Sequence, residues 1–192
     1  MPNVPILLTW MRILLIPLLF AVYYMPSQWL FPATPNLVAT LVFVVAAVTD
    51  WLDGYLARRW NQTSAFGAFL DPVADKLMIA AALIMLVQLN RLDAVIAAII
   101  IGREITISAL REWMAQIGAH KSVAVSMLGK IKTIAQMLAI PFLLYHSPLF
   151  GFALAQVGTG LIYIAAILTL WSMFYYLRMA WPYLLAEERK RV

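Results

Sequence analysis

The 192-residue sequence contains no cysteine and little charge. Without cysteine, the chain has neither disulfides nor thiolate metal sites. Charged residues make up only 12% of the chain, whereas 64% of it is hydrophobic, and the mean hydropathy is +0.86. Regular alternation of apolar and polar residues, the mark of a membrane β-barrel, is also missing from runs such as LVATLVFVVAAV. The composition therefore predicts a helical integral membrane protein.

Long apolar runs dominate what is present. A bilayer core about 30 Å thick takes about 20 apolar residues per helix. Proline, glycine, asparagine and charged residues divide the chain into six such runs. We therefore predict an all-α integral membrane fold, a single domain over residues 1–192, with six transmembrane helices at about 6–25, 35–59, 66–89, 93–117, 124–146 and 152–182. The first run contains Arg12 and lacks a cleavage site, so we interpret it as a retained helix.

The basic residues predict the orientation, because short cytoplasmic loops concentrate lysine and arginine. The connections expected on one side of the membrane contain Arg58, Arg59 and Lys121, whereas those on the other side contain only Arg91. Both termini are therefore expected in the cytoplasm. The formal charge of +5 would then face anionic lipid headgroups rather than nucleic acid.

Four aspartates fall within an otherwise apolar part of the chain. Asp50 and Asp53 share one face of the second predicted helix, and Asp71 and Asp75 share one face of the third. If these faces meet, the carboxylates repel one another and require cations. Oxygen ligands without histidine or cysteine favour Mg²⁺ or Mn²⁺. Two carboxylates from each helix suit two ions, an arrangement that serves displacement at phosphorus.

Small residues accompany these aspartates. Gly54 and Ala57 leave room for a ligand close to the backbone, and Arg58 can pair with a phosphate. Gly67 lies on the same stripe as Asp71, although small residues at this spacing also serve helix packing. Lys76 is expected to act as a counter-ion of the neighbouring aspartate.

A second group of charges occurs in the fourth and fifth predicted helices. Arg103 lies near the middle of its run and must pair with an acid or face a polar cavity. Arg111, Lys130 and Lys132 add further positive charge. We interpret this surplus as a pocket for a phosphate-bearing acceptor such as glycerol 3-phosphate. The alternative is that the arginines are buried ion-pair partners and the lysines are inner-surface anchors.

The aspartates and their neighbours follow the pattern D-x₂-D-G-x₂-A-R-x₈-G-x₃-D-x₃-D over the 26 residues from Asp50 to Asp75. This pattern resembles the signature of the CDP-alcohol phosphotransferase family at all eight fixed positions. The similarity extends to REITISALREWMA and SVAVSMLGKIKT, and thus over most of the chain.

The resemblance implies an enzyme of the bacterial inner membrane, usually a homodimer, with a polar cavity open to the cytoplasmic side. It implies that the four aspartates hold the divalent ions and that Asp75 is also the general base. It assigns Gly54, Arg58 and Ser64 to the nucleotide lipid. In the family, the N-terminal helix lies at the membrane interface near the site, which here involves a short segment at about 1–12 with Thr9 and Arg12. For these two residues, a helix cap and a topology charge remain the alternative.

The expected reaction transfers the phosphatidyl group of CDP-diacylglycerol to sn-glycerol 3-phosphate. The resemblance points to the same acceptor as the surplus of cations. Two alternatives stay open: transfer to phosphatidylglycerol, serine or an inositol derivative, and a divalent-cation transporter that uses the aspartates as its binding site. Transporters often show internal repeats or paired interrupted helices, and the sequence shows neither.

Overall fold

The computed structural model describes residues 4–30, 33–60, 65–117, 127–149 and 151–191, and almost all of this part is helical. One isolated bridge between Leu149 and Phe152 closes the last described turn. Seven helices are found within the described ranges: α1 Val4–Tyr24, α2 Ser27–Leu30, α3 Pro35–Trp60, α4 Ala65–Gln88, α5 Ala94–Gln116, α6 Met127–Tyr145 and α7 Leu154–Arg191.

The six long helices lie where the apolar runs predict them. Two details differ from the prediction. The last helix was expected to end at residue 182, but α7 continues through Pro182 to Arg191, because a proline in a helix removes one hydrogen bond and does not always end it. The short helix α2 was not expected; a bond from the Trp29 amide to the Pro26 carbonyl (3.0 Å) closes its single turn.

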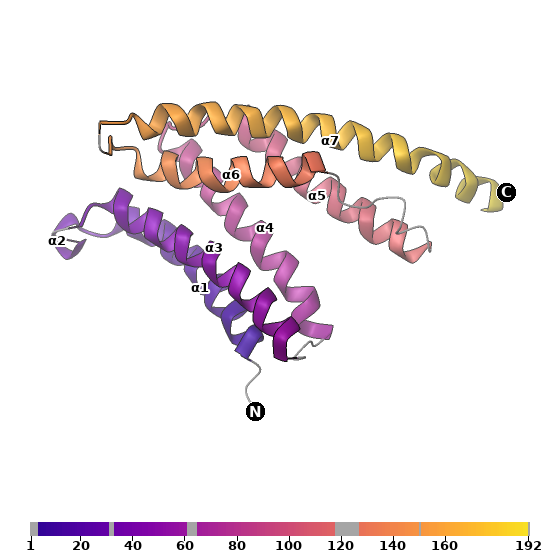
Figure 1. Ribbon diagram of the computed structural model, residues 1–192, viewed down its shortest axis with the longest axis horizontal. Helices are drawn as coiled ribbons and strands as arrows, with labels where there is room; N and C mark the ends of the chain where they lie inside the picture. The colour runs from indigo at the N-terminus through magenta and orange to yellow at the C-terminus, as the bar shows by residue number, and fades with distance from the viewer. Residues whose placement is uncertain (1–3, 31–32, 61–64, 118–126, 150, 192) are drawn as a thin grey trace.

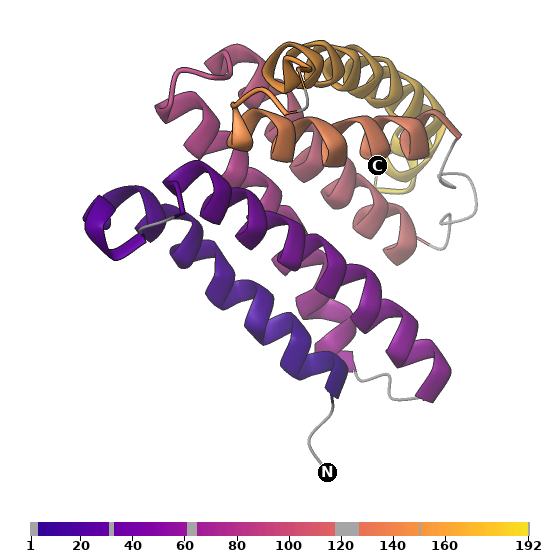
Figure 2. The ribbon, with the colours of Figure 1, turned by 60° about the vertical axis from the view of Figure 1, so that its left-hand side comes forward.

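The long helices form two groups that meet in the middle of the molecule. In Figure 1, α1 and α3 run side by side, and α6 and α7 run side by side above them. Helix α4 contacts helices of both groups, namely α1, α3, α5 and α6, while α5 packs mainly on α7. Figure 2 shows the same pairing from another side, with α1 beside α3 along the lower half. The N-terminal end of α4 therefore belongs to one group and its C-terminal end reaches the other.

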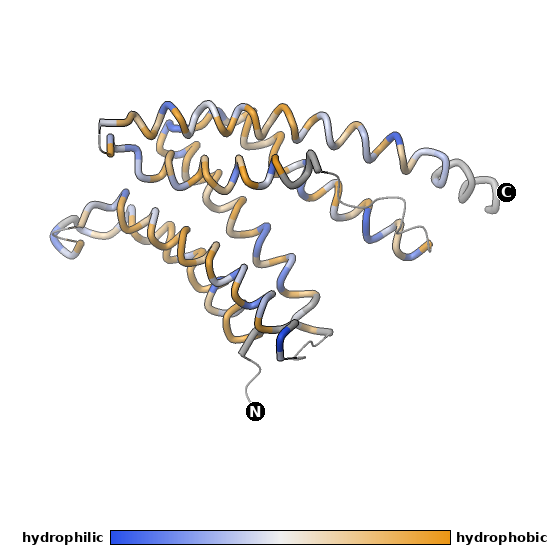
Figure 3. Tube along the Cα trace, viewed as in Figure 1, coloured by the Kyte–Doolittle hydropathy of each residue, from blue (hydrophilic) through white to orange (hydrophobic). Residues whose placement is uncertain are grey.

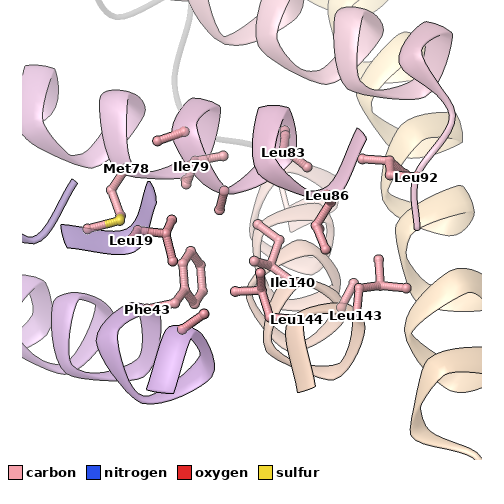
Figure 4. Close-up of a cluster of buried hydrophobic side chains, with 14 of the residues drawn as sticks. Leu19, Phe43, Met78, Ile79, Leu83, Leu86, Leu92, Ile140, Leu143 and Leu144 are labelled. Carbon is pink, nitrogen blue, oxygen red and sulfur yellow. The ribbon is translucent and has the colours of Figure 1, made fainter. Parts of the chain in front are cut away.

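The main apolar core lies where the two groups meet. Its buried side chains come from every long helix, and Figure 4 shows Phe43 of α3 beside Leu19 of α1 and opposite Ile140 of α6. Close packing of these side chains sets the positions of α3 and α4. A second, smaller cluster joins α5 to α7 through Ile107, Met114, Tyr176 and Ala180.

Apolar length supports a membrane location. Among the described residues, three helical stretches are long and apolar enough to cross a bilayer: Ile6–Tyr24, Pro35–Leu56 and Leu154–Tyr183. Figure 3 shows hydrophobic colour along most of the trace, interrupted by hydrophilic stretches within α4 and α5. The protein is thus an all-helical membrane protein, and six crossings remain a prediction.

Arg91 organises the end of the molecule opposite the aspartates. Its Nη1 donates to the carbonyls of Leu143 (3.2 Å) and Leu144 (2.6 Å), in the last turn of α6. Its Nη2 donates to Asn36 Oδ1 (2.8 Å) at the start of α3. Carbonyls in the last turn of a helix lack partners within the helix, so Arg91 satisfies them and ties the two groups together.

Candidate active site

Helices α3 and α4 bring the predicted aspartates together. Asp50 and Asp53 lie near the C-terminal end of α3, and Asp71 lies near the N-terminal end of α4. Carboxylate oxygens of these three residues lie within 4.8 Å of one another. We call these three side chains and the Arg12 side chain the acidic cluster.

Arg12 of α1 lies at the centre of the acidic cluster. Its Nη1 is 2.5 Å from Asp50 Oδ1 and 3.1 Å from Asp71 Oδ1, and its Nη2 pairs with Asp53 Oδ2. Arg12 is only 1% exposed, so these carboxylates replace the water that an arginine requires. The counter-ion is therefore Arg12, and the expectation for Lys76 is wrong: Lys76 forms no ion pair among the described residues.

Thr9 lies one turn before Arg12 on the same face of α1 and is 3% exposed. This face is buried because α1 packs against both α3 and α4. Helix α1 is continuous from Val4 to Tyr24. The structure thus brings one N-terminal residue, Arg12, directly to the aspartates, whereas the membrane position of residues 1–12 stays a prediction.

Asp75 lies beside the acidic cluster rather than in it. It lines a small cavity together with Arg12, Asp50 and Met78. Asp75 follows Asp71 by one helical turn, about 6 Å along the axis of α4, so it lies farther along α4 from its N-terminal end. Three of the four predicted carboxylates are thus in close contact, and the fourth, Asp75, lines the adjoining cavity.

The acidic cluster is closed at one end and open at the other. The side chain of Asp53 is 3% exposed, whereas those of Asp50 and Asp71 are 33% and 43% exposed. Asp53 Oδ1 is buried without a hydrogen-bond partner among the described residues. A buried carboxylate oxygen without a partner is costly, and a hard divalent cation that enters from the open end would satisfy it. The donor set therefore fits a divalent metal.

Only part of the predicted donor pocket can be described. Gly54 and Gly67 are half-buried on the helices that carry the aspartates. The side chains of Ala57 and Arg58, and the whole of Ser64, lie outside the described part of the structure. Their assignment to the nucleotide lipid remains a prediction.

The second group of charges also comes together. Glu104 Oε1 accepts from Arg103 Nη1 (3.4 Å) and pairs with Lys132 Nζ, which joins α5 to α6. Lys132 and Arg103 are 2% and 6% exposed. Arg111 lies two turns beyond Arg103 on α5. We call Arg103, Glu104, Arg111 and Lys132 the basic cluster; the side chain of Lys130 lies outside the described residues.

Two residues of α7 that the sequence analysis did not select touch the basic cluster. Ser172 Oγ accepts from Arg103 Nη2 (3.1 Å), and the Tyr176 hydroxyl accepts from Arg111 Nη2 (3.5 Å). A signal for them exists in the sequence. Thr169, Ser172 and Tyr176 are spaced by three and four residues and thus form a polar stripe on one face of an otherwise apolar helix.

The chain is similar to known proteins over most of its length. The family model for CDP-alcohol phosphatidyltransferase matches residues 2–171. The chain is 50% identical to an Escherichia coli K12 protein and 51% identical to a Shigella flexneri protein, both named CDP-diacylglycerol–glycerol-3-phosphate 3-phosphatidyltransferase. A Salmonella choleraesuis protein of the same name is 49% identical. Each match covers 93% of this chain and 94% of the relative.

Proposed function

The chain belongs to the CDP-alcohol phosphatidyltransferase family, and we propose that it transfers the phosphatidyl group of CDP-diacylglycerol to sn-glycerol 3-phosphate, giving phosphatidylglycerophosphate and CMP. The relatives are named for this reaction, and the similarity to this chain covers nearly their whole length. One observation about the site carries the proposal: the same chain holds a carboxylate cluster suited to metal ions and a separate cluster of cations suited to an acceptor phosphate.

Asp50, Asp53, Asp71 and Asp75 would hold two Mg²⁺ or Mn²⁺ ions. Their oxygens are the ligands that these ions prefer, and three carboxylates with one guanidinium leave the acidic cluster with an excess of negative charge. When bound, the ions supply charge stabilisation for the diphosphate and for the departing CMP. Displacement of Arg12 from the carboxylates would open their oxygens for this purpose.

Asp75 would act as the general base. Asp75 lines a cavity with Arg12 and Asp50 but does not belong to the acidic cluster. This position supports a role in proton transfer. Asp75 would take the proton of the primary hydroxyl of glycerol 3-phosphate. The hydroxyl oxygen would then bond to the β-phosphorus while the bond from that phosphorus to CMP breaks.

The donor would bind along α3 and the start of α4. Gly54, Ala57 and Gly67 lack bulk, so the nucleotide can approach the backbone there. Arg58 would pair with a phosphate of the donor, and Ser64 would add a polar contact. The diacyl chains would stay in the bilayer, so that only the headgroup enters the polar region.

The acceptor phosphate would bind at the basic cluster. Arg103, Arg111, Lys130 and Lys132 supply positive charge, and Glu104 is the one carboxylate paired with any of them among the described residues. This excess of buried positive charge suits a phosphate-bearing acceptor better than an uncharged alcohol. Helices α4 and α5 contact each other, which supports an acceptor site next to the carboxylates.

We further infer that the enzyme crosses the bacterial inner membrane six times, with both termini and the polar cavity on the cytoplasmic side. The relatives come from bacteria, and the distribution of basic residues supports this orientation. We expect a homodimer and a position of the first turns of α1 at the membrane interface.

The test is release of CMP by the purified protein from CDP-diacylglycerol with Mg²⁺ or Mn²⁺. We expect release to require glycerol 3-phosphate and to fail with glycerol, serine, inositol or phosphatidylglycerol. Release that depends on one of the other alcohols would overturn the acceptor assignment. No release with any acceptor, together with divalent-cation flux into proteoliposomes, would replace the enzyme with a transporter.

A further inference from the structure

Tyr176 lies at the centre of the contact between α5 and α7. It is 1% exposed and packs with Ile107 and Met114 of α5 in the second apolar cluster. In chain order, these two apolar residues alternate with the two arginines of the basic cluster. Tyr176 therefore lies among apolar side chains beside both guanidinium groups, of which Arg103 is buried and Arg111 is half-buried.

Both arginines rest on the Tyr176 ring. The Cζ atoms of Arg103 and Arg111 lie 5.9 and 5.3 Å from the ring centroid, and the Tyr176 hydroxyl also accepts from Arg111 Nη2 (3.5 Å). The face of an aromatic ring carries partial negative charge and attracts a guanidinium, most strongly where water is excluded. One ring thus restricts two long side chains that are two helical turns apart.

Ser172 holds Arg103 from the preceding turn of α7. Its hydroxyl donates to the Thr169 carbonyl (3.0 Å), which leaves the oxygen free to accept from Arg103 Nη2 (3.1 Å). Ser172 is 1% exposed, so water does not compete for this bond. Ser172 and Tyr176 are four residues apart and therefore lie on the same face of α7.

These contacts leave donor capacity on both arginines. Arg103 Nε and Arg111 Nε are buried and have no hydrogen-bond partner in the part of the chain that the structure describes. A guanidinium has five N–H donors and matches phosphate geometry with two of them at once. The two guanidinium groups are thus held in position but keep unused N–H donors, and a binding site for an anion requires both properties.

We propose that Tyr176 and Ser172 are positioning residues that hold Arg103 and Arg111 in place for the phosphate of the acceptor; this inference rests on the proposed function. Without the ring, the guanidinium groups are drawn to Glu104, whose Oε1 already binds Arg103 and Lys132. The side chains would then neutralise each other, and the site would have to break those contacts before it could bind an anion.

The test compares Tyr176→Leu, which removes the ring, with Tyr176→Phe, which keeps it. We expect Tyr176→Leu to raise the KM for glycerol 3-phosphate by about 3- to 30-fold, the range of a buried cation–π contact, and to leave the KM for CDP-diacylglycerol within about twofold. Tyr176→Phe should keep the KM for glycerol 3-phosphate close to the wild-type value, because the ring provides most of the attraction. Tyr163→Leu is the matched control, because Tyr163 is another tyrosine of α7 and is 47% exposed.

An equal rise in both KM values, or the same acceptor KM for Tyr176→Leu and Tyr163→Leu, would overturn the proposal. If Tyr176→Leu does not fold, Ser172→Ala carries the test. It should raise the acceptor KM by about 10-fold, the lower end for loss of a hydrogen bond to a charged group; an unchanged acceptor KM would then overturn the proposal.

Thermal stabilisation by glycerol 3-phosphate without donor separates this inference from the proposed function. A wild-type protein that neither binds nor uses glycerol 3-phosphate would overturn the acceptor assignment and, with it, this proposal. A wild-type protein that binds it, alongside Tyr176→Leu and Ser172→Ala variants that bind it equally well, would overturn the positioning role alone.

Discussion

The acidic and basic clusters are built as opposites. In the acidic cluster, the carboxylates of Asp50, Asp53 and Asp71 surround the single guanidinium of Arg12. In the basic cluster, Arg103 and Lys132 share the single carboxylate of Glu104, with Arg111 close by. Each cluster includes one group of opposite charge. This group lowers the cost of burying the cluster but does not cancel the net charge of the cluster.

The difference explains what each cluster can receive. Among the described residues, the acidic cluster retains excess negative charge and an Asp53 oxygen without a hydrogen-bond partner, so it suits divalent cations. Within the same part of the chain, the basic cluster retains excess positive charge and Nε atoms of Arg103 and Arg111 without a partner, so it suits an anion. A phosphoryl transfer needs both, because the donor diphosphate needs metal ions and an anionic acceptor needs its own cations.

Removal of divalent cations is expected to have the largest effect on the acidic cluster. Excess chelator should abolish CMP release, and Mg²⁺ or Mn²⁺ should restore it, because the single positive charge of Arg12 is too small to offset both the carboxylates and the diphosphate. Binding of glycerol 3-phosphate without donor should survive chelation, because the basic cluster needs no metal. Full turnover in excess chelator would contradict the metal assignment.

Asp75→Asn should lower kcat by about 10²- to 10⁴-fold, the usual contribution of a general base. The matched control is Asp93→Asn, since Asp93 caps α5 away from the site and asparagine caps a helix equally well. Retention of more than about a tenth of the wild-type rate would rule out the role of base. A Mn²⁺ titration of the variant shows whether the loss comes from metal binding instead.

Arg111→Lys keeps the charge of the basic cluster but loses the planar fork of a guanidinium. We expect kcat/KM for glycerol 3-phosphate to fall by about 10- to 150-fold, the worth of a charge-assisted contact. The KM for CDP-diacylglycerol should change far less. If both substrates were affected equally, or if only the expression level changed, Arg111 would be a structural residue.

Arg58→Ala is the counterpart on the donor side. It should raise the KM for CDP-diacylglycerol by about 10-fold, the lower end for loss of a contact to a charged group, with little change in the acceptor KM. Arg59→Ala is the neighbouring control, because Arg59 is exposed and donates to Tyr55 of its own helix. If Arg58→Ala had the wild-type KM for CDP-diacylglycerol, the assignment of Arg58 to the donor site would be wrong.

Arg12→Gln should have the smallest effect on turnover and act mainly on stability. In chelator, loss of the guanidinium leaves the carboxylates repelling one another, and we expect a cost of about 1–3 kcal/mol, because Asp50 and Asp71 are partly exposed and thus screened. Bound Mg²⁺ should remove most of this cost. Arg91→Gln, at the other end of α3, should lower the melting temperature equally in both conditions. If Arg12→Gln lost the same stability in chelator and in Mg²⁺, Arg12 would not be a counter-ion that metal ions can replace.

The sequence alone determined the local part of this structure. Apolar runs predicted every long helix, because about 20 apolar residues span a bilayer whatever their neighbours are. The spacing of Asp50 with Asp53 and of Asp71 with Asp75 predicted which residues share a face, because the helical period depends only on the chain itself. The family signature then pointed to the chemistry, and the relatives support that reaction.

Only the tertiary structure decided which faces meet. Arg12 reaches Asp53 across 41 positions of sequence, and Arg103 and Arg111 reach α7 across 69 and 65 positions. Helical periodicity cannot select among such partners, because it fixes the direction of a side chain around its own axis and not the neighbour it faces. Packing of the shared apolar core made that choice. It placed Arg12, rather than Lys76, among the carboxylates, and packing of the second apolar cluster placed Tyr176 against the two arginines.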